Sequence, residues 1–294
     1  MEAEQSVTLG ITNALTPKII DFVYTEYPPE DGWLERRPLS ILQPTVENTR
    51  LVGIAFEYVL RAILHRRYPG AHATPWDGNS ILAHYRHRIH LAPPSKDSLQ
   101  KDKVESLLNQ AVRTYTLYLR GEGSDEAVRR SALDVARIDR LGSEEPLGFP
   151  GEYSAAYLRE LKSLQDRIPV RRFQGHTRVW LSPKLAPLSE SVGYGVPDLI
   201  LDDTLVEVKT WSEGSFFNPI HARKAWAQLL AYVVLLDHQN LSSGKLERVD
   251  RVGIYWSRAG SLKTNTLERF RDSRAYRRLA DCLRGAADSI TPVS

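Results

Sequence analysis

The sequence predicts an α/β protein with a mixed central β-sheet flanked by helices. Over residues 51–68, apolar side chains recur at steps of three and four, as in an amphipathic helix. The second half of the chain contains short segments rich in β-branched and aromatic residues, separated by turn residues, which are typical of strands. A long apolar segment with a helix start lies between the last two of these strands. A far upstream helix, three strands, a helix and a further strand form a sheet with helices against it.

The individual elements follow from local signals. Pro69-Gly70 ends the first helix, Ser124 followed by two acidic residues begins another, and Asn218-Pro219 supplies a cap and a first-turn proline. We expect helices over 51–68, 98–120, from Ser124 onward, 153–167, 219–239 and 266–285. We expect strands over 171–181, 195–201, 204–211 and 251–257, and one or two more within 74–92.

The chain divides into four segments. Residues 1–50 are interpreted as an irregular N-terminal arm packed on the core, and residues 51–97 as the first part of that core. Residues 98–170 form a predicted helical insertion or subdomain. Residues 171–294 carry the remaining strands and a basic C-terminal helix. A length of 294 residues is ample for a buried core.

Composition restricts the class of protein. Hydrophobic residues make up 42% and charged residues 26%, the net charge is +3, and the pI near 8.9 permits a polyanionic partner without requiring one. The single cysteine, Cys282, excludes an internal disulfide and a multi-cysteine metal centre. No apolar run approaches the roughly 18 residues that span a bilayer, and the first 20 residues do not resemble a signal peptide. We expect a cytoplasmic protein without a membrane partner.

Three charged residues stand inside or beside the predicted strands. Asp198 opens one strand, and Glu207 and Lys209 lie two residues apart in the next, so they share a face. Asp202-Asp203 is a hairpin-length turn that would bring Asp198 close to Glu207. Burying unpaired charge is costly, so these charges indicate a site at a cleft.

Two clustered carboxylates repel each other, and a hard divalent cation such as Mg²⁺ resolves that repulsion. Water bound to the cation becomes more acidic. A nearby ammonium can orient water for attack or stabilise charge that develops on a phosphate. Two acids and a lysine therefore suit hydrolysis of a phosphodiester.

The pattern Pro197-Asp198, eight residues, then Glu207-Val208-Lys209 resembles the signature of the PD-(D/E)XK nuclease superfamily. Two further features resemble its RecB-like and Cas4-like branch. Gln228 and Tyr232 look like its Q-x-x-x-Y element and lie one helical turn apart. Upstream, Gly53 and Glu57 resemble its G-x-x-x-E motif, in which the glycine allows close approach of another element.

The resemblance implies a restriction-endonuclease-like core over roughly 51–68 and 173–257, with the helices in between as an insertion. It does not extend to the iron–sulfur cluster of many relatives, because those four cysteines are missing. It implies that Mg²⁺, for which Mn²⁺ can substitute, is held by Asp198, Glu207, the Val208 carbonyl and, directly or through water, Glu57.

In the same resemblance, Lys209 orients the attacking water, and Gln228 and Tyr232 position that lysine or contact the phosphate backbone. His221, Arg223 and Lys224 lie at a predicted helix N-terminus near the site, where phosphates bind readily. We expect DNA as the substrate, in repair, processing or antiphage defence, and RNA is not excluded.

Two alternatives stay open. The chain could be a nucleic-acid-binding or assembly protein with a degenerate nuclease fold, which binds DNA without cleaving it. It could also be a structural protein whose charges are simply paired, in which case Lys209 would pair with a remote acid outside any cleft. The helices of 98–170 are a candidate surface for a protein partner or a homo-oligomer.

Overall fold

The computed structural model describes residues 11–30, 40–73, 98–139, 153–189, 192, 195–243 and 248–285, and the structural statements below concern these residues. The strands expected within 74–92 lie outside the described residues. None of the described helices combines the length and apolar character needed to cross a membrane.

Six strands of the described chain form one mixed sheet, with spatial order equal to sequence order. β1 and β2 are parallel, β2, β3 and β4 are successively antiparallel, β4 and β5 are parallel, and β6 is antiparallel to β5. The predicted mixed α/β class is therefore confirmed. The strands are β1 (His72–Ala73), β2 (Val179–Leu181), β3 (Leu199–Leu201), β4 (Thr204–Lys209), β5 (Arg251–Trp256) and β6 (Ser261–Thr266).

The turn between β3 and β4 is built around Asp202, whose backbone has a left-handed φ of 50°. Its carboxylate accepts hydrogen bonds from the backbone N–H groups of Thr177 and Arg178, each 3.0 Å long, and lies 2.7 Å from His176 Nδ1. Asp tolerates this backbone conformation better than most residues. The predicted hairpin is confirmed, with Leu199 opposite Val206.

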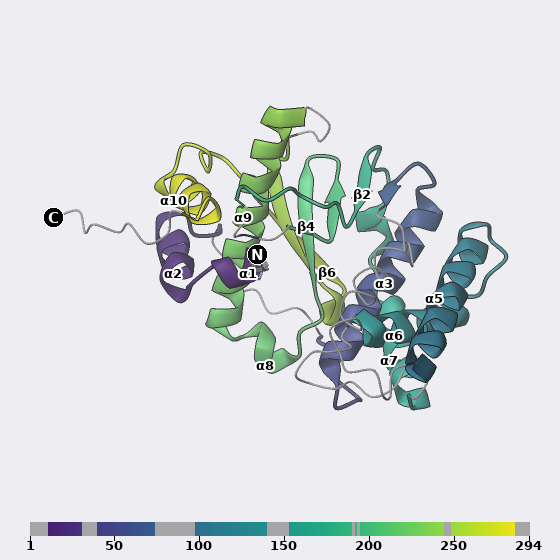
Figure 1. Cartoon of the computed structure of the whole chain (residues 1–294). Helices are drawn as coiled ribbons and strands as arrows, with labels where there is room; N and C mark the ends of the chain where they lie inside the picture. The colour runs from purple at the N-terminus through teal and green to yellow at the C-terminus, as the bar shows by residue number, and fades with distance from the viewer. Residues whose placement is uncertain are drawn as a thin grey trace.

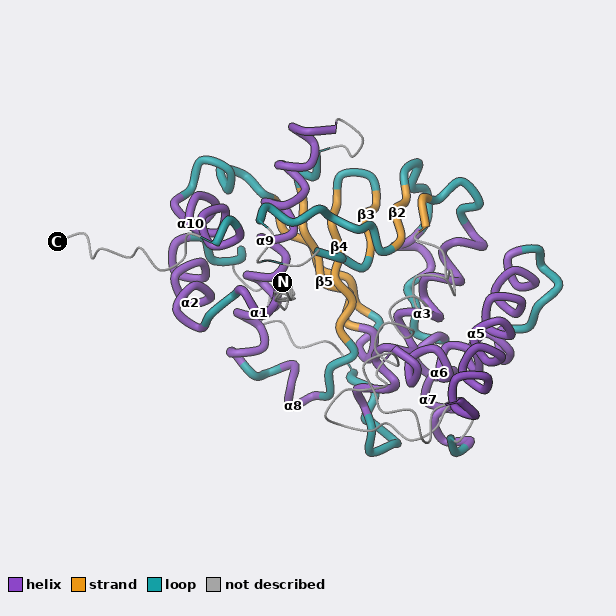
Figure 2. Tube along the Cα trace, viewed as in Figure 1, coloured by secondary structure: helices purple, strands orange, loops and turns teal. Residues whose placement is uncertain are grey.

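Helices cover both faces of the sheet (Figures 1 and 2). On one face, a buried cluster joins helix residues such as Phe56, Leu108 and Leu133 to Val206 and Val208 of β4. The helices of this layer are α3 (Thr49–Arg67), α5 (Ser98–Leu119), α6 (Asp125–Asp139) and α7 (Ala155–Gln165). The predicted helical insertion thus shares a core with α3 and the strands, and its status as a separate subdomain stays a prediction.

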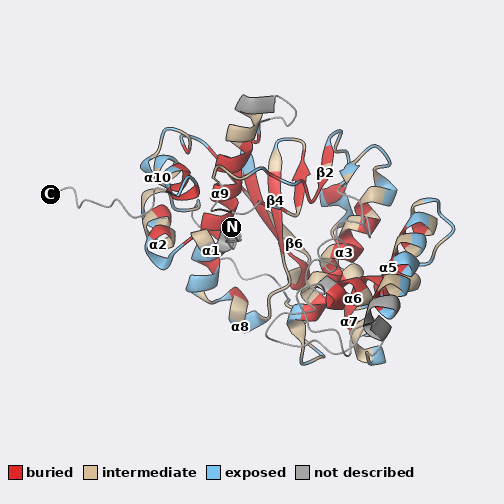
Figure 3. Cartoon of the chain, viewed as in Figure 1, coloured by how far each residue is buried: buried red, intermediate tan, exposed pale blue. Residues whose placement is uncertain are grey.

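The opposite face is covered by α9 (Pro219–Ser243), whose middle is buried, together with α2 (Pro17–Glu26) and α10 (Arg274–Leu283) (Figure 3). Leu205 of β4 and Ile254 of β5 belong to this second cluster. Two one-turn helices, α1 (Ile11–Ala14) and α8 (Glu213–Phe216), flank the same layer. The sheet is therefore sandwiched, and β4 is buried from both sides.

Three sequence predictions were wrong in detail. Residues 1–50 are not wholly irregular, because Thr16 caps α2 by accepting from the Ile19 N–H at 3.4 Å. The segment 171–181 begins as a 3₁₀ turn, Val170–Phe173, and only its end is a strand, since Gly175 turns the chain with φ of 78°. The helix expected over 266–285 begins only at Arg274, and the polar strand β6 precedes it.

Candidate active site

Asp198 lies immediately before β3, and the β3–β4 pairing sets its place. Its Oδ2 accepts a hydrogen bond of 2.7 Å from the backbone N–H of Val208. Pro197 just before it has no N–H to donate, which suits a position where regular pairing has not yet begun. Asp198 is thus held beside the end of β4, next to Glu207, as the hairpin predicts.

Glu207 and Lys209 point from β4 toward α9 and contact each other. Lys209 Nζ donates to Glu207 Oε1 at 2.8 Å and to Gln228 Oε1 at 3.3 Å. Gln228 Nε2 donates to the same Glu207 Oε1 at 3.0 Å and lies 2.8 Å from the Tyr232 hydroxyl oxygen. The predicted pair on α9 and the predicted pair on β4 therefore form one hydrogen-bonded network. The structural alternative requires Lys209 to pair with a remote acid, whereas its partner here is Glu207 of the same strand.

Glu57 reaches the same region from α3, on the other side of the sheet. The carboxyl groups of Asp198 and Glu207 are near enough to raise its pKa, although burial is the larger cause. Arg61, one turn further along α3, lies 3.7 Å from Glu57 and opposes this rise. Arg61 was not among the predicted site residues, although its four-residue spacing from Glu57 is a readable signal.

All three carboxyl groups hold their protons more tightly than usual. Burial raises the pKa of Asp198, against Arg61 and Lys209. Burial and the Asp198 charge raise the pKa of Glu207 to about 7, while Lys209 opposes them. Burial would lower the pKa of Lys209, but the surrounding acids, Glu207 foremost, outweigh it and raise the pKa. The site is a mutually repelling set of acids beside a firmly charged ammonium.

A cleft of about 300 Å³ opens beside this network. Glu57, Val208 and Lys209 line it, so three of the predicted site residues face one space. The side chain of Glu57 keeps 29% of its surface exposed, while that of Glu207 keeps 7%. Gly53, the glycine of the predicted G-x-x-x-E motif, also lines the cleft. The rest of the lining was not predicted: Thr49, Arg50, Ile54, Thr210, Trp211, Ser212 and Ser215.

Gly53 faces the segment that follows β4, but the approach is not as close as the motif suggests. A methyl group at Gly53 would lie 3.5 Å from Thr210 Cβ, an ordinary van der Waals contact. A side chain larger than alanine would extend among the lining residues of the cleft. The glycine therefore keeps room in the cleft rather than relieving a clash.

A fully buried ion pair holds the residue that follows β4, Thr210. The Arg258 guanidinium, after β5, binds Glu160 of α7 and donates to the Thr210 carbonyl at 3.4 Å. Ser257 Oγ lies 3.0 Å from Thr210 Oγ1. These contacts fix the residue next to Lys209, and no sequence pattern predicts them because the partners are far apart in the chain.

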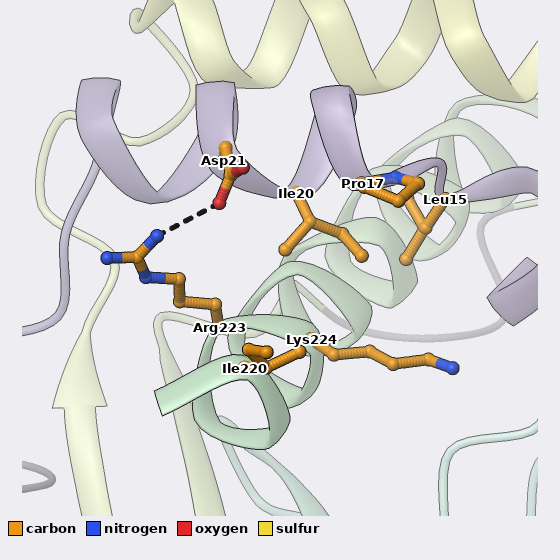
Figure 4. Close-up of a pocket in the computed structure, with 7 residues that line it drawn as sticks. All are labelled: Leu15, Pro17, Ile20, Asp21, Ile220, Arg223 and Lys224. Carbon is orange, nitrogen blue, oxygen red and sulfur yellow. Dashed lines mark hydrogen bonds and ion pairs between the residues drawn. The ribbon is translucent and has the colours of Figure 1, made fainter. Parts of the chain in front are cut away.

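The three residues proposed to bind nucleic acid lie at the start of α9, but they are not gathered in this cleft. Arg223 forms an ion pair of 3.0 Å with Asp21 of α2 and lies over the Tyr24 ring. Arg223 and Lys224 line a separate cavity of about 540 Å³ between α2 and α9 (Figure 4). His221 packs against Trp211 of the cleft, with ring centroids 5.7 Å apart. Only His221 is thus placed next to the candidate site.

Several arginines of the C-terminal basic region form ion pairs with acidic residues. Arg271 binds Asp237 with two hydrogen bonds of 2.8 and 2.9 Å. Arg274 pairs with Glu26, and Arg284 with Asp281. The local positive charge is therefore smaller than the arginine count suggests.

The donor set suits a hard divalent cation in its chemistry. Asp198, Glu207 and Glu57 offer only oxygen, and Glu207 Oε2 is buried without a hydrogen-bond partner among the described residues. The three carboxyl groups are not arranged around a single point. Across the described ranges, no three His, Cys, Asp or Glu side chains form a group that could hold an ion as they stand. Lys209 and Arg61 instead pair with Glu207 and Glu57.

Comparisons with known protein families, with curated proteins and with solved structures found no match to this chain.

Proposed function

We propose that this protein is a metal-dependent nuclease that hydrolyses phosphodiester bonds of DNA, on a restriction-endonuclease-like core with an inserted helical subdomain. The observation that carries the proposal is the network at the end of β4. It joins Asp198, Glu207, Lys209, Gln228 and Tyr232, in the order and spacing of the resemblance, beside a cleft that also reaches Glu57. Structural ion pairs alone do not require all of these groups in one network beside a cleft.

In hydrolysis, a water oxygen forms a bond to phosphorus while one bridging phosphorus–oxygen bond breaks, and the leaving oxygen takes up a proton. Mg²⁺, held by Asp198, Glu207 and the Val208 carbonyl, with Glu57 directly or through water, would supply positive charge against the phosphate. Lys209 orients the attacking water and offsets developing negative charge. Gln228 holds Lys209 and Glu207 in place by hydrogen bonds to both.

Cleavage of labelled DNA in Mg²⁺ or Mn²⁺ tests the proposal. Wild type should cleave, and D198N and E207Q, which keep the shape of each side chain, should each lose at least about a hundredfold in rate. The exposed Lys18 on α2 provides a control in K18A, which should retain activity. Metal-dependent cleavage that persists in both single variants, D198N and E207Q, would contradict the assignment of these residues.

A DNA-binding protein that does not cleave is the second candidate. It is favoured by one observation, namely that Lys209 and Arg61 pair with Glu207 and Glu57 in place of an assembled acidic group. It predicts that DNA binds equally well with and without divalent cation, that no product forms, and that D198N does not change affinity.

A further inference from the structure

Among the described residues, Arg61 is held next to the acids by an ion pair and by packing rather than by hydrogen bonds. Its Nη2 is 3.7 Å from Glu57 Oε2, which is an ion pair but too long for a hydrogen bond. The guanidinium lies over the Tyr58 ring, 4.7 Å from the centroid. Its Nε is buried and has no hydrogen-bond partner among the described residues. The side chain is 18% exposed, so water screens this pair only in part.

The charged side chains of the site form two ion pairs, and Asp198 belongs to neither. Lys209 pairs with Glu207 within β4, and Arg61 pairs with Glu57 within α3. Asp198 has the Val208 N–H as its donor. With all acids ionised the five side chains sum to one negative charge. Each cation forms an ion pair with a different acid, and both also lie near enough to Asp198 to oppose the rise in its pKa.

We infer that Arg61 is a positioning residue that holds Glu57 in an ion pair in place of a divalent cation, and so limits the affinity of this site for that cation. The inference rests on the proposed function, because it takes the acids to be ligands. A neutral residue at position 61 would release Glu57 from its partner and remove one positive charge from beside the acids. Both effects favour a bound cation, since opposite charges attract more strongly where water is partly excluded.

Calorimetric titration with Mn²⁺, without DNA, measures this directly. R61Q should bind Mn²⁺ about three- to tenfold more tightly than wild type, the range expected for a partly screened charge pair. R61K keeps the charge and should stay nearer to wild type. Arg67 is exposed at the end of the same helix, so R67Q removes an equal charge elsewhere and should change the affinity less than twofold. Unchanged or weaker binding by folded R61Q overturns the inference.

The role of Glu57 is tested by repeating the substitution in its absence. The gain from R61Q should be clearly smaller in E57Q/R61Q relative to E57Q, because no carboxylate is left to release. Equal gains in both backgrounds would reduce Arg61 to a general charge effect and overturn its positioning role. Thermal unfolding of each variant establishes that it is folded, which matters because Arg61 also packs on Tyr58.

The outcomes separate this inference from the proposed function. Mn²⁺ binding that is lost in D198N and E207Q but insensitive to R61Q contradicts only the role of Arg61. The absence of binding in every variant, R61Q included, contradicts both.

Discussion

Lys209 donates a 2.8 Å hydrogen bond to Glu207, the residue two positions earlier on the same strand. Side chains two apart on a strand lie on one face, and here α9 covers that face and adds Gln228 as a second partner for both. The ammonium is therefore fixed in direction rather than free to rotate into solvent. A fixed charge at a cleft costs no reorganisation when substrate charge develops.

K209A should abolish or nearly abolish cleavage, by about a hundredfold or more, because the charge aimed at the reacting phosphate is removed. Glu207 would keep Gln228 as a donor, so its place in the strand should persist. Initial rates at saturating Mg²⁺ measure the effect, and K18A serves as the charge-matched control. A rate within twofold of wild type for K209A would show that this lysine has no part in the chemistry.

The stability of the metal-free protein should depend on pH through the acids. Burial and Asp198 raise the pKa of Glu207 to about 7, from an ordinary value near 4.5. Between these values the folded state binds more protons than the unfolded state, so this contribution is present below about pH 4.5 and is lost as pH rises through about 7. The Tm of wild type, measured with chelator present, should fall relative to that of E207Q between pH 5 and 8. E207Q cannot titrate at this position, so parallel Tm curves would contradict the shifted pKa.

The buried pair of Arg258 and Glu160 should be the charged contact of the described core whose loss lowers the free energy of unfolding most. Arg258 is 1% exposed, and its removal in R258A would leave Glu160 as a buried charge without its partner, at a cost of about 3–5 kcal/mol. Urea unfolding gives the free energy. E160L/R258M replaces both charges by apolar groups and should recover much of the loss.

The exposed pair of Lys162 and Asp166 provides the matched control, since both side chains are 59% exposed. K162A should unfold at nearly the wild-type urea concentration, because water screens this pair. A similar loss in K162A and R258A would mean that burial does not determine the cost.

The parts of the fold that local sequence signals determine were predictable. The periodicity of α3, the Asp202-Asp203 turn and the Asn218-Pro219 start of α9 each depend on a few adjacent residues. These three elements carry Glu57, Asp198, Glu207, Lys209, Gln228 and Tyr232, so most of the candidate site followed from them. The structure brings these residues together as the strand and helix periodicities require.

The remainder depends on contacts between distant residues. Asp21 neutralises Arg223 from 202 residues away, and no local pattern reveals that pairing. The strand β6 is an edge strand of polar residues, SLKTNT, which lacks the apolar alternation that marks a half-buried strand. The start of α2 is different, because Thr16-Pro17 is a cap and first-turn proline that local sequence does reveal, although no helix was predicted there.

Gly195 provides the last test, because it packs against the helix that carries the Gln228–Tyr232 pair. A methyl group there would lie 2.6 Å from Leu235 Cδ1, closer than such groups approach in folded proteins, and 3.1 Å from Tyr232 Cδ1, tighter than most such contacts. Its two backbone hydrogen bonds with Leu185 hold the glycine in place, so the helix side chains must move instead. Leu235 can yield by rotation, but Tyr232 can do so only by shifting its hydroxyl relative to Gln228.

G195A should therefore lower the unfolding free energy by about 1–3 kcal/mol, the usual cost of overpacking, and slow cleavage through the Gln228 network. G214A is the matched control: nothing lies within 4 Å of its added methyl group, and alanine favours a helix over glycine, so stability should stay equal or rise slightly. Equal effects of G195A and G214A on both stability and rate would show that the close approach at Gly195 does not position Tyr232.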